Sequence, residues 1–120
     1  MSSQSAASQC TIARKRIDAV EVLSVAGVVD MLTASQLEEA IAAAAEDTPH
    51  GVVVDLSAVE FLASAGMGIL VAARDELPES VHFAVVADGP ATSRPLKLVG
   101  VADVVGLHAT LDEALAALAA

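Results

Sequence analysis

The feature that most constrains this chain is a short apolar strand that runs through a turn into an apolar helix, within residues 55–70 (DLSAVEFLASAGMGIL). Residues 51–56 are apolar on both faces of the expected strand, which is typical of a strand in the middle of a sheet. The helix begins near Ser64 and runs to about Leu77, because Pro78 cannot continue it. A central strand followed by an apolar helix restricts the fold to a sheet with helices packed on it.

Strands and helices alternate along the remainder of the chain, after two opening strands. Sequences of the form Thr-x-x-Gln and Thr-x-x-Glu, at residues 33–36 and 110–113, are capping boxes that predict the starts of two helices. Gly27 is expected to end the second strand, and Gly100 to end a helix in which Pro95 marks either the start or a kink. The other predicted elements are strands at 11–16, 20–26, 80–87 and 103–107 and a helix at 91–99.

The order of these elements, ββαβαβαβα, predicts an α/β fold with a single mixed, mostly parallel β-sheet packed with helices. One domain at residues 10–120 is expected, preceded by a polar, Ser-rich tail at 1–9 that we expect to be disordered. The tail lacks the basic-then-apolar arrangement of a signal peptide. The longest uncharged apolar stretch, 61–73, is shorter than the roughly 20 residues of a membrane span, so no membrane association is expected.

The formal net charge of −10 argues against a nucleic-acid partner. The six Lys and Arg residues are scattered, whereas a nucleic-acid surface needs a basic stripe with aromatic side chains. The short basic cluster at residues 14–16 is interpreted as a solvated strand end or hairpin. Cys10 is the single cysteine, so no disulfide or cysteine-based metal site is expected within the chain, and a reducing, cytoplasmic location is expected.

Catalytic, metal-binding and cofactor-binding sites are not expected. His50, His82 and His108 are far apart in the sequence, and none has the i, i+4 spacing that places two imidazoles on one metal. The Ser-x-Gly sequence at Ser64 resembles half of a nucleophile elbow, but Leu62 stands where that motif requires glycine. The sequence also has no Gly-rich phosphate loop followed by Lys, so any kinase that modifies the chain is another protein.

Ser64 is expected in the first turn of its helix, where backbone N–H groups are unpaired and the helix dipole is positive. Such a position favours a side-chain oxygen and, more strongly, a phosphate. Two interpretations are open: a phosphorylation site, or a structural N-cap, since serine is among the commonest cap residues. Glycine costs about 1 kcal/mol inside a helix. Gly66 and Gly68 therefore suggest a backbone that something approaches closely, although Gly68 is equally consistent with packing on the sheet.

Several motifs of the chain resemble, in the same order, those of the STAS domain found in bacterial anti-sigma factor antagonists. Residues 27–30 (GVVD) resemble the family's turn after its second strand, and residues 55–62 (DLSAVEFL) its central strand. Residues 63–68 (ASAGMG) resemble its phosphorylation loop, and residues 89–101 its later Ser-Pro helix segment. The resemblance runs from Val20 to the C-terminus and implies that residues 10–120 form a STAS domain.

The resemblance implies a partner switch. The family's phosphorylated serine corresponds to Ser64, and its turn aspartate, part of the surface that meets the kinase, corresponds to Asp30. The unphosphorylated protein would bind an anti-sigma factor that is itself a serine kinase, and would so release a sigma factor; a phosphatase would reverse the modification. The other implied contact residues are Val28, Ala63, Ala65, Gly66 and Met67, of which Met67 is equally consistent with a place in the core.

Three positions depart from the family pattern: Ala63 replaces the usual Asp, Ala65 the usual Ser or Thr, and Val28 the usual Glu. The absent carboxylate at position 63 removes a like charge beside a phosphate, but also a contact that a kinase can use. Two other functions stay open. One is a STAS module that binds a protein or small ligand without switching, with Ser64 only as a helix cap. The other is a small hydrolase, which predicts ester turnover that Ser64→Ala abolishes.

Overall fold

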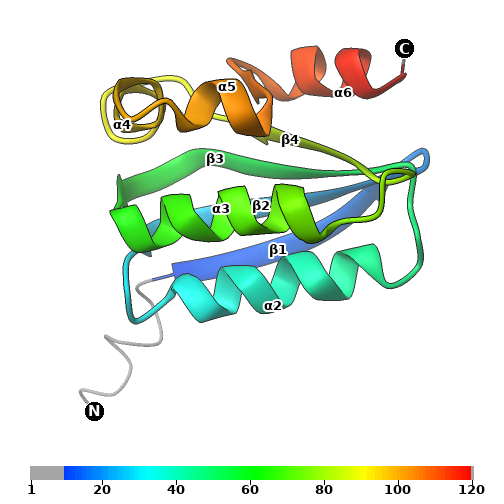
Figure 1. The fold of residues 1–120 in the computed structure, drawn as a ribbon, viewed down its shortest axis with the longest axis horizontal. Coiled ribbons are helices and arrows are strands. Elements are labelled where there is room, and N and C mark those ends of the chain that lie inside the picture. The colour runs from blue at the N-terminus through cyan, green and yellow to red at the C-terminus, as the bar shows by residue number, and fades with distance from the viewer. Residues whose placement is uncertain (1–9, 120) are drawn as a thin grey trace.

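The computed structural model describes residues 10–119, which form one five-stranded sheet in the order β1-β2-β3-β4-β5. The expected tail at 1–9 lies outside the described residues. The first two strands are antiparallel and the other neighbouring strands are parallel, so the predicted mixed, mostly parallel sheet is confirmed (Figure 1). The strands are β1 (Cys10–Ile17), β2 (Val20–Val29), β3 (Gly51–Leu62), β4 (His82–Val86) and β5 (Leu107–His108).

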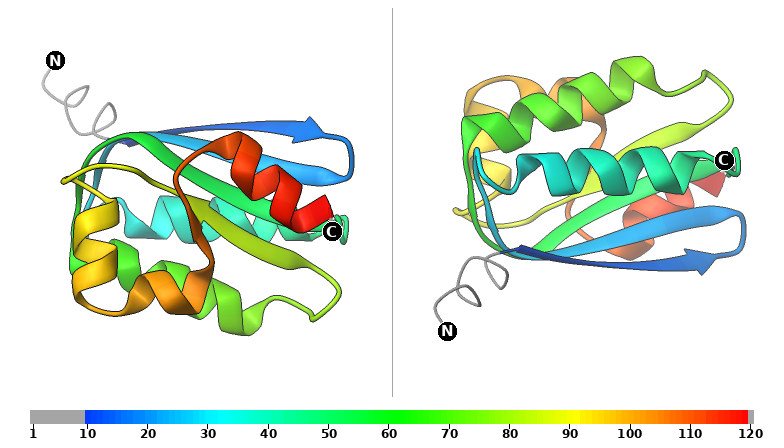
Figure 2. Two further views of the ribbon diagram at one scale, coloured as in Figure 1. Left: turned by 90° about the horizontal axis from the view of Figure 1, so that it is seen from above. Right: turned by 90° about the horizontal axis from the view of Figure 1, so that it is seen from below.

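Helices cover both faces of this sheet (Figure 2). The helices are α2 (Ala34–Ala45), α3 (Ser64–Glu76), α4 (Ser93–Leu98), α5 (Val101–Val105) and α6 (Leu111–Ala119). α2 and α3 lie side by side on one face, where Leu37 and Leu70 are fully buried. α6 packs on the other face, with Leu118 among buried valines of β2, β3 and β4. α5 contacts α3, α4 and β4, and Leu96 of α4 and Val105 of α5 join the core of the α2–α3 face.

The burial of the central strands follows from their two covered faces. In β2, Val22 belongs to the core under α6, whereas Leu23 belongs to the core under α2 and α3. The first four residues of β3, Gly51 to Val54, are all buried, which confirms the prediction that this is a central strand. In α2 the apolar residues Leu37 and Ile41 are buried and the glutamates between them are exposed, as in an amphipathic helix.

The strands β2 and β3 continue well beyond their predicted ends. β2 continues through Gly27 to Val29, and β3 runs on to Leu62. Gly27 has a φ of 97°, and the β2–β3 register shifts on both sides of it. This glycine is therefore part of an irregular, bulged pairing, and the prediction that it ends β2 is wrong. The added residues extend both strands to the point where α2 and α3 begin.

The predicted strand at 103–107 is also wrong. Residues Val101–Val105 form the short helix α5, and β5 is only two residues long. Valine favours strands, which explains the prediction, but the tertiary fold buries Val105 completely as part of a helix. Gly100 and Gly106, with φ of 82° and 75°, redirect the chain at the two ends of α5. The element order is therefore ββαβαβααβα.

The two predicted capping boxes have different outcomes. Before α6, Thr110 Oγ1 accepts a hydrogen bond from the N–H of Glu113 (3.1 Å), and Glu113 Oε1 accepts one from the N–H of Ala109 (3.3 Å), one residue earlier than the motif predicts. Thr33 makes no side-chain bond to α2, so the prediction for this threonine is wrong. Pro95 lies in the first turn of α4, where a missing N–H is tolerated, which supports the helix start over the kink.

The basic cluster at 14–16 lies on the hairpin of β1 and β2, as predicted, and two of its residues neutralise a buried charge. Arg14 Nε and Arg16 Nη1 donate to the carboxylate of the buried Glu21, at 2.7 and 2.9 Å. A buried carboxylate without such partners is strongly destabilising. This cluster therefore supports the sheet, and it adds a structural role to the solvated hairpin that the sequence suggests.

Gly66 allows the start of α3 to lie against the end of β2. A Cβ atom at Gly66 would be 2.6 Å from Cγ1 of Val29 and 2.9 Å from Cδ1 of Leu62, which is closer than packed carbon atoms approach. At Gly68, apart from its chain neighbours and the nearby backbone of its own helix, no described atom lies within 4 Å of the Cβ position. The prediction that another group closely approaches the helix backbone is thus confirmed for Gly66, where residues of the sheet are the close neighbours. The alternative that Gly68 is needed for packing on the sheet is wrong.

We expect Gly66→Ala and Gly68→Ala to have opposite effects on stability. Gly66→Ala should lower the free energy of unfolding by about 1–3 kcal/mol, because the added methyl group overpacks the contact with Val29. Gly68→Ala should raise it by about 0.5–1 kcal/mol through helix propensity alone. Urea unfolding followed by circular dichroism measures both, since the chain has no Trp or Tyr. A Gly66→Ala protein as stable as Gly68→Ala would contradict the close packing.

Candidate functional site

Ser64 is the first residue of α3, and its side chain is exposed. Ala63 holds the N-cap position in extended backbone, with φ −84° and ψ 167°, and no side-chain hydrogen bond caps the helix. The interpretation of Ser64 as a structural cap is therefore wrong. Its hydroxyl has no hydrogen-bond partner among the described residues, which leaves it open to solvent and to another protein.

The backbone at the start of α3 leaves two N–H groups without a partner. The N–H groups of Gly66 and Met67 donate to the carbonyl of Ala63, at 2.9 and 3.2 Å. The N–H of Ala63 donates to the carbonyl of Val29 (2.8 Å) and so joins the helix start to the end of β2. Within residues 10–119, the N–H groups of the two residues between Ala63 and Gly66 have no acceptor. With the positive end of the helix dipole, they suit an anion carried by Ser64.

Asp30 follows β2 and shapes the turn into α2 with its own side chain. Its Oδ1 accepts hydrogen bonds from the N–H groups of Leu32 (2.9 Å) and Thr33 (3.1 Å). The Oγ1 of Thr33 accepts from the N–H of Asp30 and donates to the carbonyl of Val28, both at 2.9 Å. The half-buried carboxylate is thus engaged within the turn, and it determines the position of the residues between Asp30 and α2.

Three large apolar side chains are exposed near the Asp30 turn and the start of α3. Met31 is 81% exposed and Leu32 is 79% exposed within the turn, and Phe61 is 55% exposed near the end of β3. The β2–β3 register pairs Phe61 with Val28, two residues before Asp30, and so places it beside the turn. The end of α4 lies at the same end of the molecule and adds two more exposed apolar residues, Leu98 and Val99 (Figures 1 and 2).

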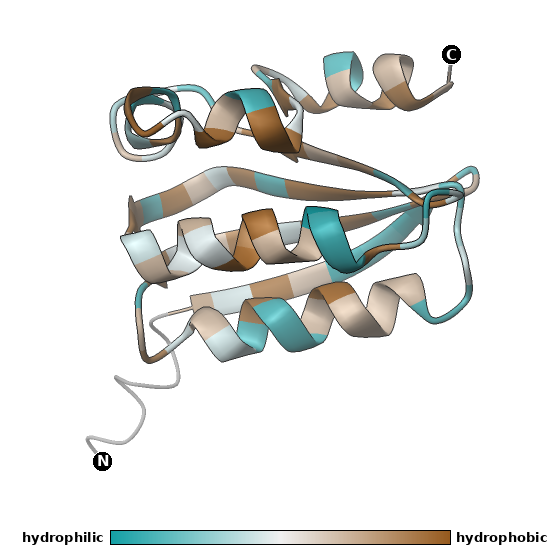
Figure 3. Ribbon diagram, in the orientation of Figure 1, coloured by the Kyte–Doolittle hydropathy of each residue, from teal (hydrophilic) through white to brown (hydrophobic). Residues whose placement is uncertain are grey.

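We define the switch surface as Ser64 together with Met31, Leu32 and Phe61. Figure 3 shows hydrophobic colouring on part of the turn before α2 and at the end of β3. The sequence patterns above did not predict a role for the three apolar residues. A usable signal was present in the turn, where two large apolar residues follow Asp30 outside any predicted strand or helix. Apolar side chains gathered at one exposed place are typical of a protein-binding surface.

The other predicted contact residues divide into two groups. Val28, Ala63 and Ala65 are partly exposed around the switch surface, so a partner can reach them. Gly66 is buried, and Met67 is only 9% exposed and packs in the main core. The core interpretation of Met67 is therefore confirmed, and the contact of Gly66 and Met67 with a partner stays a prediction.

The sheet brings together two histidines that are distant in the sequence. The rings of His50 and His82 lie 4.8 Å apart, centre to centre, and His50 Nε2 is 2.6 Å from the carbonyl oxygen of Leu118. These two histidines are therefore neighbours in space although they are far apart in the sequence. No group of three His, Cys, Asp or Glu side chains within residues 10–119 is arranged to hold a metal. Burial, and to a smaller degree the charge of Asp30, raises the pKa of the Cys10 thiol, so this thiol is a poor nucleophile.

The family model of the STAS domain matches residues 11–114 of this chain. The match covers most of the sequence, and the chain belongs to the STAS domain family. The described part of the chain, 10–119, contains no helix long and apolar enough to cross a membrane.

Two relatives of this chain are anti-sigma factor antagonists from mycobacteria. The anti-sigma-F factor antagonist RsfB of Mycobacterium tuberculosis is 48% identical over 96 residues, which are 80% of this chain and 79% of RsfB. The crystal structure of an anti-sigma factor antagonist from Mycobacterium paratuberculosis superposes with a TM-score of 0.88 at 47% identity, over 92% of this chain and 95% of that one. The unphosphorylated form of SpoIIAA, at 16% identity over 88% and 93% of the two chains, has a TM-score of 0.69 and shares the fold.

We expect Asp30→Ala to destabilise the protein, because it removes the acceptor of two backbone N–H groups in a half-buried turn. The free energy of unfolding should fall by about 1–3 kcal/mol. Glu79→Ala is the matched control, since Glu79 is an exposed carboxylate in a loop and should have an effect within about 0.5 kcal/mol. Equal unfolding midpoints for the two variants would show that the Asp30 carboxylate does not support the turn.

Proposed function

We propose that the protein is an anti-sigma factor antagonist whose switch surface binds an anti-sigma factor while Ser64 is unphosphorylated. Binding releases the sigma factor that the anti-sigma factor would otherwise hold. The observation that carries this proposal is the free, exposed hydroxyl of Ser64 beside three exposed apolar side chains. One modification at Ser64 changes the charge of that entire surface. The relatives at 47% and 48% identity, which are named as anti-sigma factor antagonists, support the same class of partner.

The partner that we propose is an anti-sigma factor of the serine kinase type, which phosphorylates Ser64 and is thereby released. A phosphatase returns the protein to its binding form. The role is that of a cytoplasmic binding protein, without enzyme activity of its own and without a nucleic-acid, membrane or cofactor partner. The exposed apolar side chains of the switch surface support a protein partner.

Phosphorylation acts on this surface through charge and hydration. A phosphate adds about −1.5 to −2 charges at neutral pH. Enclosing that charge against Met31, Leu32 and Phe61 would remove its water without supplying a counter-charge, which costs several kcal/mol. A cost of about 3 kcal/mol lowers affinity about a hundredfold, which is enough to separate the two proteins.

The modified protein stays folded in this proposal. The two unpartnered N–H groups at the start of α3 lie next to Ser64, and the helix dipole stabilises a phosphate there by up to about 1 kcal/mol. Ala63 and Ala65 place no carboxylate beside the phosphate, so no like charge opposes it at those positions. The start of α3 therefore accommodates a phosphate on Ser64, although the same phosphate prevents binding of the partner.

The rival function is a STAS module that binds its partner without switching. The cap role of Ser64 on which this rival depends has no support in the geometry, because Ala63 is the N-cap. Binding without a switch is still a separate outcome, and a comparison of Ser64 variants distinguishes it from our proposal. The small hydrolase is a weaker rival, since Leu62 stands where a nucleophile elbow requires glycine.

We expect the cognate kinase and ATP to add one phosphate to the wild-type protein, at Ser64. Mass spectrometry of the peptide that contains Ala63–Arg74 identifies the site, and Ser64→Ala should abolish the modification. Ser57 is the internal control: it is also exposed, but its hydroxyl donates to the Asp55 carboxylate, which disfavours a phosphate there. A phosphate on Ser57, or none on the protein, would contradict the assignment.

We expect substitutions on the switch surface to change affinity for the anti-sigma factor in a graded way. Ser64→Ala should bind like the wild type, and Ser64→Glu should bind at least tenfold more weakly, because it places a charge in the interface. Phe61→Ser should weaken binding about tenfold through lost apolar contact. Ala117→Ser, on the exposed face of α6, is the control and should have no effect. Isothermal titration calorimetry measures all four, and full binding by Ser64→Glu would favour the module that does not switch.

A further inference from the structure

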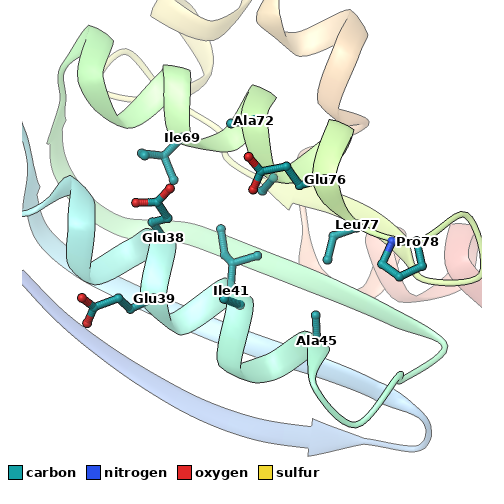
Figure 4. A pocket seen from close by; sticks show the side chains of 11 residues that line it. Glu38, Glu39, Ile41, Ala45, Ile69, Ala72, Glu76, Leu77 and Pro78 are labelled. Atoms are coloured by element: carbon teal, nitrogen blue, oxygen red, sulfur yellow. The ribbon is translucent and has the colours of Figure 1, made fainter.

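A groove between the C-terminal halves of α2 and α3 is a second candidate binding surface, and its lining differs from that of the switch surface (Figure 4). It has a volume of about 420 Å³ and is lined by both helices and by residues 77–78. Ile41 and Ile69 provide apolar walls, and the small side chains of Ala45 and Ala72 leave the space between the helices unfilled. A mainly apolar cavity of about 300–1,000 Å³ is typical of a small-molecule site.

The charged residues that line this groove are all acidic. They are Glu38 and Glu39 of α2 and Glu76 of α3. Figure 4 shows the Glu38 carboxylate beside Ile69 and the Glu76 carboxylate over the same opening, while Glu39 extends away from α3. α2 has no basic residue, and Arg74, the basic residue of α3, lines a different depression. Within residues 10–119 no salt bridge engages these carboxylates, so the chain supplies no cation to the groove.

The groove is separate from the switch surface. Ile69 and Leu77 lie five and thirteen residues beyond Ser64, about 8 and 20 Å along the axis of α3. None of the residues that line the groove belongs to the switch surface. An occupant of the groove would therefore be additional to the anti-sigma factor, and it would not depend on the phosphorylation of Ser64.

We propose that this groove binds a small organic cation, with its apolar body between Ile41 and Ile69 and its ammonium or guanidinium group between Glu38 and Glu76. An anionic amphiphile would be repelled by both carboxylates. A neutral ligand would form no ion pair with them. We favour a small molecule over a helix of a partner protein, because α2 from Glu38 to Ala45 spans about 10 Å, which accommodates no more than the shortest set of helix anchors, i to i+7.

The probe for the test is phenethylammonium, with phenylpropionate as its anionic counterpart and 2-phenylethanol as its neutral one. We expect the ammonium compound to shift the amide resonances of α2 and α3 around the groove, in a saturable way, in ¹⁵N-labelled wild-type protein. The neutral alcohol should bind at least fivefold more weakly and the carboxylate should give no saturable shifts. Shifts that never saturate and spread over the whole acidic surface would overturn the proposal, as would equal binding of the carboxylate.

Single substitutions in and outside the groove test whether the ammonium compound binds there. Glu38→Gln and Glu76→Gln should each weaken the ammonium compound three- to tenfold, and Glu79→Gln, an exposed carboxylate outside the groove, should leave its affinity unchanged. These surface changes do not alter the core, so loss of folding cannot explain the result. Ala72→Leu should fill the groove and abolish binding while the spectrum stays dispersed. Unchanged affinity in both glutamine variants would overturn the proposal. A basic amphipathic peptide that saturates the groove when the amine does not would also overturn it, in favour of a protein segment.

Discussion

The contact between the start of α3 and the end of β2 determines where the functional serine lies. Gly66 permits this contact, since any larger residue would collide with Val29, and the hydrogen bond from the Ala63 N–H to the Val29 carbonyl fixes its direction. The helix therefore begins at the surface, directly beside the end of the sheet. Because this contact involves only one side of the helix start, the first residue, Ser64, is exposed, whereas Gly66 and Met67 are buried. A looser contact would leave the helix start without a defined position.

The switch surface depends on this placement and on the Asp30 turn. The turn is held by hydrogen bonds to the Asp30 carboxylate and the Thr33 hydroxyl, which leaves Met31 and Leu32 in solvent. Keeping apolar side chains in water is unfavourable for an isolated protein, and a partner that covers them recovers that free energy. The same surface is sensitive to charge, because a phosphate can be hydrated only while no partner covers it. The residues that attract the partner protein and the residue whose phosphorylation releases it are thus adjacent.

α3 connects two surfaces with different chemistry. Its first turn carries Ser64 among apolar neighbours, and its last turns form one wall of the acidic groove with α2. Small residues have different effects at the two ends of α3. Gly66 allows close packing at the start of the helix, whereas Ala72, together with Ala45 of α2, leaves the groove unfilled near its C-terminal end. The helix is buried along one side by Met67, Leu70 and Ala73, so the two surfaces are held at a constant separation by the core.

The amino-acid sequence alone determined the α/β class, the central strand at 51–56, the helix that starts at Ser64 and the family, because burial on both faces and the motif order are local patterns. Only the tertiary structure decided that Val101–Val105 is a helix, that Ala63 and not Ser64 is the N-cap, and that Met67 is core. It also paired Phe61 with Val28, near the turn that carries Met31 and Leu32, and opened the groove between α2 and α3. These outcomes depend on contacts between segments distant in the sequence, whose packing overrides local propensity.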